Sequence, residues 1–378
     1  MQALKVLFWV ALVGCAFSYV IYPMLLRLMP ARQRTKPQDA GPQLPSITLI
    51  IACRNEAGRL RHKLDNVLAL DYPDLEILVA SDASDDASDD IVREYASKGV
   101  QLVRSEQRRG KEYAQGLAIN VARGEILVFS DAGTDLPADS MKLLADAFSD
   151  PGVGAVSSED VFVSADGRIV GEGAYVRYEM WLRRLESERA GLVGLSGSFF
   201  AVRRSVISRW DHTIPSDFAC ALQTVHAGLV AVADPRVKGV YRDIKDPSRE
   251  YGRKLRTAVR GMTAVARWSE VLNPFRYGAF AFQVWGHKVM RWLVPWFMAL
   301  LLLTCIALAG QGAVYMGMLA IQLVGYALVL LAHLVPALRQ LVPVRIAYFF
   351  VQANLALAHA ALQFLGGRRI VTWEPSAR

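Results

Sequence analysis

The sequence predicts an α/β fold with a mostly parallel sheet, joined to α-helical membrane segments. Of its 378 residues, 53% are hydrophobic and 21% are charged, and the two kinds are segregated along the chain. The span from residue 45 to about residue 270 alternates runs of strand length with helical patterns, and long, nearly uncharged runs flank it. Such an alternation is typical of a parallel sheet with right-handed crossovers. A nearly uncharged run of about 20 residues is long enough to cross a bilayer core.

The first apolar run covers residues 6–26 and predicts a transmembrane anchor over residues 1–30. A cleaved signal peptide is the alternative, but no small-residue cleavage pattern follows the run. Basic residues follow it instead, which favours an uncleaved helix with residues 27–45 on the cytoplasmic side. These basic residues are Arg27, Arg32, Arg34 and Lys36.

Four strands are predicted in the first half of the central span, each from an apolar run that ends at polar residues. The helix after the first strand stops at Asp71-Tyr72-Pro73. A second helix passes through Ile91 and Tyr95, and the loop Arg108–Lys111 opens a third. The strands are predicted at Ile47–Cys53, Leu75–Ala80, Val100–Val103 and Glu125–Asp131.

Carboxylates follow three of these strands: Glu56, Asp82 and Asp131. Open α/β sheets bind their ligands beyond the carboxyl ends of parallel strands, so we expect these side chains to share one edge of the sheet. Three carboxylates in register indicate a polar ligand accompanied by a cation. For Asp131 alone, an Asx-turn or a helix cap before Pro137 is the alternative.

Five motifs follow one another in this span: Leu70-Asp-Tyr-Pro73, Glu76-Ile-Leu-Val79, Ser81-Asp-Ala-Ser84, Arg109-Gly-Lys111 and Asp131. In this order they resemble family 2 glycosyltransferases with the Rossmann-like GT-A fold, over roughly residues 45–270. The resemblance implies a nucleotide-sugar donor site in which Glu56 and Asp82 contact the nucleoside and Lys111 lies near the base or the phosphates. Asp131 would be the metal-binding member of the family's D-x-D signature, so a divalent cation, Mg²⁺ or Mn²⁺, is expected.

The D-x-D signature is incomplete in this chain, because the second acid is replaced by Gly133. Glycine cannot ligate a cation through a side chain. Asp135 could compensate directly or through water, or it could cap the helix expected near Pro137; N-cap preferences favour the cap. Mg²⁺ often takes few protein ligands and completes its shell with water and phosphates.

The second half of the span carries the acceptor-side features of the same family. Residues 171–190 have an amphipathic helical pattern, and Gly194–Arg204 looks like the family's glycine-led strand, where backbone must approach a sugar closely. Ile214–Phe218 precedes a helix that the pattern continues to Gly228. By the resemblance, Asp217 is the catalytic base that accepts the proton of the attacking hydroxyl. A helix N-cap is the alternative for Asp217, and Ser216 stands where the family motif is usually acidic.

A single in-line displacement with inversion at the anomeric carbon follows from this assignment. Arg253, Arg256 and Arg260 are candidates for binding the diphosphate, since their spacing places them on one helical face. A cytosolic surface facing lipid headgroups would look the same. The Q-x-x-R-W signature of processive synthases is not found, so processive synthesis is not predicted.

The last part of the chain predicts further membrane segments. Residues 271–291 mix aromatic and basic residues and predict an interfacial helix, followed by transmembrane helices within residues 292–366 and a tail at 367–378. Arg339 and Arg345 favour the cytoplasmic side. The polar last segment, residues 346–365, could span the membrane or lie in the interface, the latter leaving Thr372-Trp373-Glu374 cytoplasmic.

Together these patterns predict a membrane-bound inverting glycosyltransferase of the hexosyltransferase type. It would move a sugar from a nucleotide-sugar donor to a hydroxyl of a lipid-linked or polysaccharide acceptor, in cell-surface or exopolysaccharide synthesis. We expect a multi-pass protein of the inner (cytoplasmic) membrane that contacts membrane lipids. Its catalytic domain is expected in the cytosol. A polyprenyl-phosphate glycosyltransferase and a non-catalytic scaffold of a polysaccharide export complex are the alternatives. Nucleic-acid binding is not predicted, because no recognition motif accompanies the net charge of +8.

Overall fold

The computed structural model describes residues 1–33, 44–163, 174–242 and 247–370. The chain divides into two compact units, which we describe separately. The sheet unit comprises Met29–Lys245, Thr263–Ala281 and Ile370–Arg378, and the helical unit comprises Met1–Leu28, Asp246–Met262 and Phe282–Arg369. The predictions for Arg34, Lys36 and Thr372-Trp373-Glu374 lie outside the described residues.

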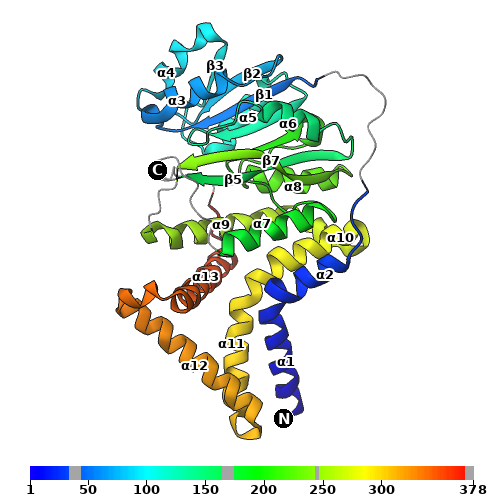
Figure 1. Ribbon diagram of the computed structural model, residues 1–378, viewed down its shortest axis with the longest axis vertical. Coiled ribbons are helices and arrows are strands. Elements are labelled where there is room, and N and C mark those ends of the chain that lie inside the picture. Colours follow the sequence, from blue (N-terminus) through cyan, green and yellow to red (C-terminus); the bar gives the residue numbers. More distant parts are fainter. Residues whose placement is uncertain (34–43, 164–173, 243–246, 371–378) are drawn as a thin grey trace. The chain divides into compact units, whose positions relative to one another are not determined.

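A seven-stranded, mostly parallel sheet forms the centre of the sheet unit (Figure 1), in the order β3-β2-β1-β4-β6-β5-β7. Strand β6 is antiparallel to its neighbours β4 and β5, and the other pairs are parallel. The four predicted strands are confirmed to within one residue at their ends. The strands are β1 (Ile47–Cys53), β2 (Leu75–Ser81), β3 (Val100–Arg104), β4 (Ile126–Asp131), β5 (Val153–Val163), β6 (Phe199–Arg203) and β7 (Val230–Arg242).

Helices cover both faces of the sheet because its central strands are apolar on both sides. In β1, Leu49 and Ile51 pack in a core that includes residues of α3, α4 and α6, whereas Ile50 packs in a second core that includes residues of α5 and α8. All seven residues of β1 are buried. The helices are α3 (Ala57–Leu68), α4 (Ser88–Glu94), α5 (Lys111–Val121), α6 (Ser140–Ala147), α7 (Ala174–Ser187) and α8 (Ser216–His226).

The helical unit contains the long apolar segments of the chain. Among the residues that the structure describes, four helices are long and apolar enough to cross a membrane: Gln2–Leu28, Pro274–Gln311, Ala313–Leu334 and Val342–Leu365. They include α1 (Gln2–Ala16), α2 (Tyr22–Leu28), α10 (Pro274–Val284), α11 (Met290–Leu308), α12 (Ala313–Leu334) and α13 (Val342–Leu365). Helix α9 (Pro247–Arg267) begins in this unit and ends in the sheet unit.

Close packing joins the N-terminal helices of this unit to α11 and the π-helical turn Trp285–Val289 that precedes it. Phe8 of α1 is fully buried in a cluster with Leu301 and Cys305 of α11. The Ser18 hydroxyl donates a hydrogen bond of 2.6 Å to the carbonyl of Gly286. A Cβ at Gly286 would lie 2.2 Å from Tyr22, so only glycine fits between these two segments.

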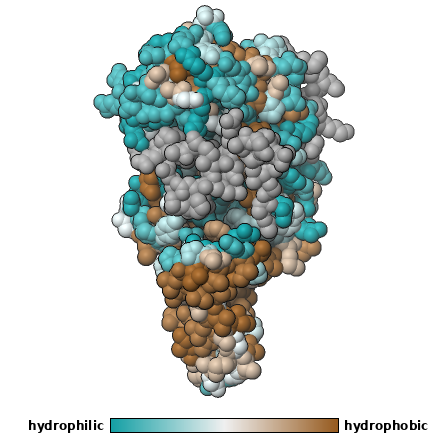
Figure 2. All heavy atoms as spheres, turned by 60° about the vertical axis from the view of Figure 1, so that its left-hand side comes forward, coloured by the Kyte–Doolittle hydropathy of each residue, from teal (hydrophilic) through white to brown (hydrophobic). Residues whose placement is uncertain are grey.

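The surface of the long helices is apolar (Figure 2), where brown side chains gather in the lower part of the view. On α12, Ile321, Val324 and Leu334 are exposed by 67–69%. A surface of this kind needs an apolar environment to be stable. The predicted membrane association is therefore supported by the structure as well as by composition.

Candidate functional site

The carboxyl ends of β1, β2 and β4 meet at one edge of the sheet, as predicted. In the ladder Cys53 lies opposite Ser81, and Ala52 lies opposite Asp131. Glu56 and Asp82 follow directly after these strands. The three predicted carboxylates thus share the sheet edge at which open α/β sheets bind ligands.

Hydrogen bonds link the turns at this edge, and the backbone of two residues there is strained. Asn55 (φ 54°) and Ala83 (φ 50°) hold left-handed backbone conformations, which non-glycine residues rarely adopt. The Arg54 guanidinium donates hydrogen bonds to the carbonyls of Asp82 and Ala83, and the Asn55 side chain accepts one of 3.0 Å from the amide of Asp85. Such strain concentrates at functional sites, where the surrounding structure over-determines it.

Asp82 fixes the loop that leads to Lys111. Its carboxylate is buried and accepts hydrogen bonds from the amides of Arg109 (2.8 Å) and Gly110 (2.9 Å). Gly110 has φ 102°, a conformation that favours glycine, and α5 begins at the next residue. Asp82 therefore acts in this structure as the anchor of the loop, while its predicted nucleoside contact remains a prediction.

Lys111 and Asp131 form the centre of the site. The Lys111 ammonium lies 2.5 Å from Asp131 Oδ1 and donates a second hydrogen bond of 2.9 Å to the carbonyl of Gly197. Both side chains are largely buried, at 9% and 17% exposed. This charge-assisted pair fixes the position of the Lys111 ammonium at the sheet edge, and the charge of Asp131 offsets that of the ammonium.

A guanidinium lies beside the incomplete D-x-D signature. A Cβ built on Gly133 would lie 3.1 Å from Arg59 Nη1. The Nε of Arg59 pairs with Glu56 Oε2 at 2.8 Å, so the predicted nucleoside ligand Glu56 holds this cation. Arg59 was not among the predicted site residues; its place in the first turn of the helix after Glu56 is the signal that could have found it.

Asp135 is not the helix cap that the sequence favoured, and that prediction is wrong. Helix α6 begins at Ser140 with Asp139 at the N-cap, because the chain after Asp131 first forms a turn. Asp135 instead exchanges backbone hydrogen bonds of 2.8 and 3.0 Å with Val240. Its carboxylate lies 3.0 Å from His62 Nε2.

Lys63 supports the same turn from beneath and was missed by the sequence prediction. Its side chain is fully buried, and its ammonium donates hydrogen bonds to Ser130 Oγ (2.9 Å) and to the carbonyl of Thr134. Burial lowers the pKa of Lys63 to about 7, against the opposing effect of Asp135 and Asp131. Lys63 stands among Leu60, Leu64 and Val67 on the apolar stripe of α3, and a lysine in such a stripe is the signal for it.

Replacing Lys63 with Met should remove a pH dependence of stability. A lysine whose pKa is lower in the folded state binds its proton more readily when unfolded, so stability rises with pH from about 7 towards 10.5. We expect the melting temperature of the wild type, relative to K63M, to increase between pH 6.5 and pH 9. Thermal melts of both proteins in detergent test this; parallel pH profiles would contradict it.

Asp217 faces the same glycine as Lys111. It lies in the first turn of α8, whose N-cap residue is Pro215, so the alternative of an Asp217 N-cap does not hold. A Cβ on Gly197 would lie 3.5 Å from Asp217 Oδ2, in ordinary van der Waals contact. Gly197 thus has the Lys111 ammonium on its carbonyl and the Asp217 carboxylate next to its α-carbon.

Hydroxyl groups surround this glycine. Ser196 Oγ donates a hydrogen bond of 2.6 Å to Asp160 Oδ1, and Ser198 Oγ lies 3.0 Å from the Tyr241 hydroxyl. Burial, followed by the charge of Asp160, raises the pKa of Tyr241 well above its usual range. These polar groups, from β5, β7 and the Ser196–Ser198 loop, form the hydroxyl cluster. Sequence reasoning singled out the loop for its glycines and missed its serines.

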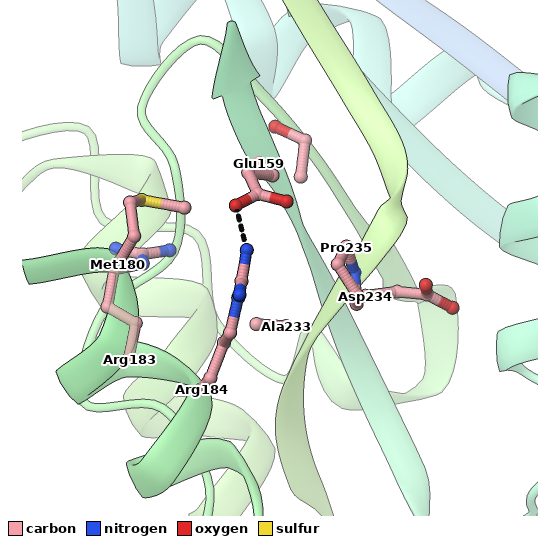
Figure 3. A pocket seen from close by; sticks show the side chains of 8 residues that line it. Glu159, Met180, Arg183, Arg184, Ala233, Asp234 and Pro235 are labelled. Atoms are coloured by element: carbon pink, nitrogen blue, oxygen red, sulfur yellow. Dashed lines mark hydrogen bonds and ion pairs between the residues drawn. The ribbon is translucent and has the colours of Figure 1, made fainter. Parts of the chain in front are cut away.

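Helix α7 contacts the hydroxyl cluster through Arg183, which Figure 3 shows beside Arg184. Arg183 donates a hydrogen bond of 2.6 Å to Ser157 Oγ, which also accepts one of 2.7 Å from the amide of Ser196. Its neighbour Arg184 pairs with Glu159 in the shallow pocket that the figure shows between α7, β5 and β7. Arg183 therefore helps to position the Ser196–Ser198 loop through Ser157.

Three of the predicted site residues belong to the other compact unit. Arg253, Arg256 and Arg260 belong to the part of α9 that lies in the helical unit. Arg253 is exposed and Arg260 is buried, so they do not form one evenly exposed face. Their contact with a diphosphate remains a prediction.

Comparisons with known proteins find similarity to glycosyltransferases. Residues 48–210 match the family model described as Glycosyl transferase family 2. Poly-beta-1,6-N-acetyl-D-glucosamine synthase of Staphylococcus epidermidis is 26% identical over 199 residues, covering 50% of this chain and 48% of that protein. The synthase of Staphylococcus aureus strain COL is 27% identical over 184 residues, covering 47% and 44%. The chain thus spans about half the length of the curated relatives it matches.

A solved structure resembles nearly the whole chain. It is the mannosyltransferase PcManGT from Pyrobaculum calidifontis, in complex with GDP-Man and Mn²⁺. The TM-score is 0.71 with 22% identity, over 97% of this chain and 100% of that one. At this identity the likeness shows the fold.

Proposed function

We propose that this chain, whose residues 48–210 match the Glycosyl transferase family 2 model and whose fold is GT-A, transfers a sugar from a nucleotide-sugar donor to a hydroxyl group, with inversion. The observation that carries the proposal is the place of Gly197 between Lys111 and Asp217. A cation for a leaving diphosphate and a carboxylate for an attacking hydroxyl border the same small residue. This arrangement supports a single displacement.

The proposed reaction forms one bond and breaks one bond at the anomeric carbon. The acceptor oxygen attacks on the Asp217 side, and its proton passes to the Asp217 carboxylate as the new carbon–oxygen bond forms. The bond from the anomeric carbon to the diphosphate breaks, and the nucleoside diphosphate leaves with the electron pair. Lys111 stabilises the charge that develops on this leaving group.

A divalent cation on Asp131 was expected from the resemblance, and the mannosyltransferase structure contains Mn²⁺. The residues of this chain do not fit a two-carboxylate cation site. Asp131 Oδ1 is bound by Lys111, Gly133 has no side chain, and a guanidinium borders Gly133. The described residues also contain no group of three or more His, Cys, Asp or Glu side chains arranged for a metal ion.

We propose a polysaccharide or lipid-linked glycan as the acceptor. Two observations support this: the curated relatives are polysaccharide synthases by name, and four helices in the described part of this chain are long and apolar enough to cross a membrane. The hydroxyl cluster offers paired donors and acceptors suited to a sugar next to Asp217. A place in the inner membrane with a cytosolic catalytic domain follows as part of this proposal.

The function is tested by incubating purified full-length protein in detergent with a panel of nucleotide sugars, and by measuring release of the nucleoside diphosphate. Each donor is assayed with Mg²⁺, with Mn²⁺ and with EDTA. We expect one or a few donors to be hydrolysed or transferred. If no donor is bound or turned over under any of these conditions, the scaffold alternative replaces the enzyme.

Enlarging residue 197 should separate acceptor use from donor binding. Alanine fits, because its Cβ would meet Asp217 at 3.5 Å, whereas valine would place methyl groups between Asp217 and the acceptor. We expect G197V to raise the acceptor KM by about 10-fold or more, from a loss of roughly 1.4 kcal/mol in acceptor binding, with an unchanged Kd for the nucleoside diphosphate. G197A is the matched control. Equal effects on donor and acceptor would contradict this assignment.

A further inference from the structure

We propose that the donor diphosphate is bound in this enzyme by N–H donors of two protein side chains, Arg59 and Lys111, and that its binding needs no divalent cation. This inference rests on the proposed function, because it assumes a nucleotide-sugar donor. It concerns the position at which the D-x-D signature is incomplete.

The Arg59 guanidinium borders the space that a side chain at position 133 would enter. Its Nη1 lies 3.1 Å from a Cβ built on Gly133, and its Cδ lies 3.9 Å from the same point. A carboxylate at position 133 would therefore meet Arg59 and pair with it, rather than stand open to a metal ion. In this chain the second carboxylate of the D-x-D signature is missing at Gly133, and the guanidinium of Arg59 lies beside that position.

Arg59 is held in place and still reaches solvent. Its Nε pairs with Glu56 Oε2 at 2.8 Å, and its side chain is 33% exposed. It stands in the first turn of the twelve-residue helix α3, where the helix dipole also favours anions. A planar guanidinium with several donors matches the geometry of phosphate oxygens.

Asp131 is already neutralised by a protein cation. Lys111 lies 2.5 Å from Asp131 Oδ1, and a metal ion at this oxygen would have to displace the ammonium. The ammonium of Lys63 lies beneath the same turn, where it bonds to Ser130 and Thr134. The turn from Asp131 to Thr134 is thus supported by lysines and bordered by an arginine.

Binding of nucleoside diphosphates to the purified full-length protein tests the inference. Isothermal titration with UDP, GDP, ADP and dTDP is carried out once in EDTA and once in Mn²⁺. We expect the Kd of the preferred nucleotide to differ by less than about 3-fold between the two conditions, about 0.65 kcal/mol. Loss of the charged contact in R59Q should raise the Kd in EDTA by about 10- to 100-fold.

Arg93→Gln is the matched control. Arg93 forms the same kind of pair, to Asp90 three residues before it, but on α4 and with 59% of its side chain exposed. We expect R93Q to bind nucleotide like the wild type. Gly133→Asp gives the reverse test: the new carboxylate should weaken binding in EDTA, and the double variant R59Q/G133D should bind nucleotide better with Mn²⁺ than without it. Thermal melts confirm that each variant is folded.

The outcomes separate this inference from the function on which it rests. Nucleotide binding by the wild type that requires Mn²⁺, or an unchanged Kd of R59Q in EDTA, would overturn the inference and leave the glycosyltransferase function standing. Failure to bind any nucleoside diphosphate in either condition would contradict the proposed function, and this inference with it.

Discussion

Replacing Asp217 with Asn is expected to lower the turnover number for transfer to a hydroxyl by about 10²- to 10⁴-fold, the usual contribution of a general base. Asparagine keeps the shape of the side chain but cannot accept the proton of the attacking hydroxyl. Because Lys111 bonds to the carbonyl of Gly197 whereas Asp217 lies next to its α-carbon, the Kd of the nucleoside diphosphate should stay within a few-fold of the wild type.

Steady-state kinetics and nucleotide titration of D217N measure both quantities. Asp90→Asn is the control, because Asp90 is 75% exposed on α4 and pairs with Arg93 one helical turn away. If D217N keeps its turnover number, the acceptor is not a hydroxyl that needs a base. The polyprenyl-phosphate alternative would then be favoured, since a phosphate acceptor is already ionised.

Lys111→Met is expected to give the second large effect, a loss of about 10²- to 10³-fold in kcat, comparable to the removal of one preorganised charge-stabilising donor. The variant also leaves Asp131 without its partner in a largely buried position, which should lower the melting temperature. Adding Asp131→Asn to K111M should restore much of the melting temperature but not the activity.

Kinetics and thermal melts of the single and double variants separate these two roles. Lys98→Met serves as the control. Lys98 is exposed, precedes β3 in the sequence and lies over the Tyr95 ring. A double variant that regains activity would show that Lys111 acts only by compensating Asp131.

Much of the site could be predicted because a parallel sheet collects strand ends. Glu56, Asp82 and Asp131 follow apolar strands, and once the strands are parallel and in register their ends must meet at one edge. The same reasoning could not give the partners of each carboxylate. Whether Asp82 binds a nucleoside or the amides of Arg109 and Gly110 depends on the path of a loop, and loop paths leave no periodic pattern in the sequence.

Other features depend on contacts between distant segments. The insertion of β6 between β4 and β5 pairs β6 with a strand about 70 residues earlier in the chain, which local patterns do not encode. Lys63 reads as a polar interruption of an apolar stripe until the turn above it is known. Asp135 was assigned as a cap because Pro137 suggested a helix start, but its backbone pairs with Val240 more than 100 residues away.

The contact between Gly286 and Tyr22 bears on how this enzyme can evolve. A methyl group at position 286 would overlap the tyrosine ring at 2.2 Å, and the carbonyl of Gly286 is the acceptor for Ser18. Position 286 can therefore gain a side chain only if position 22 becomes smaller at the same time. We therefore expect positions 22 and 286, which are separated by most of the sequence, to change together in evolution. Their contact also joins the first helices of the chain to the segment that precedes α11.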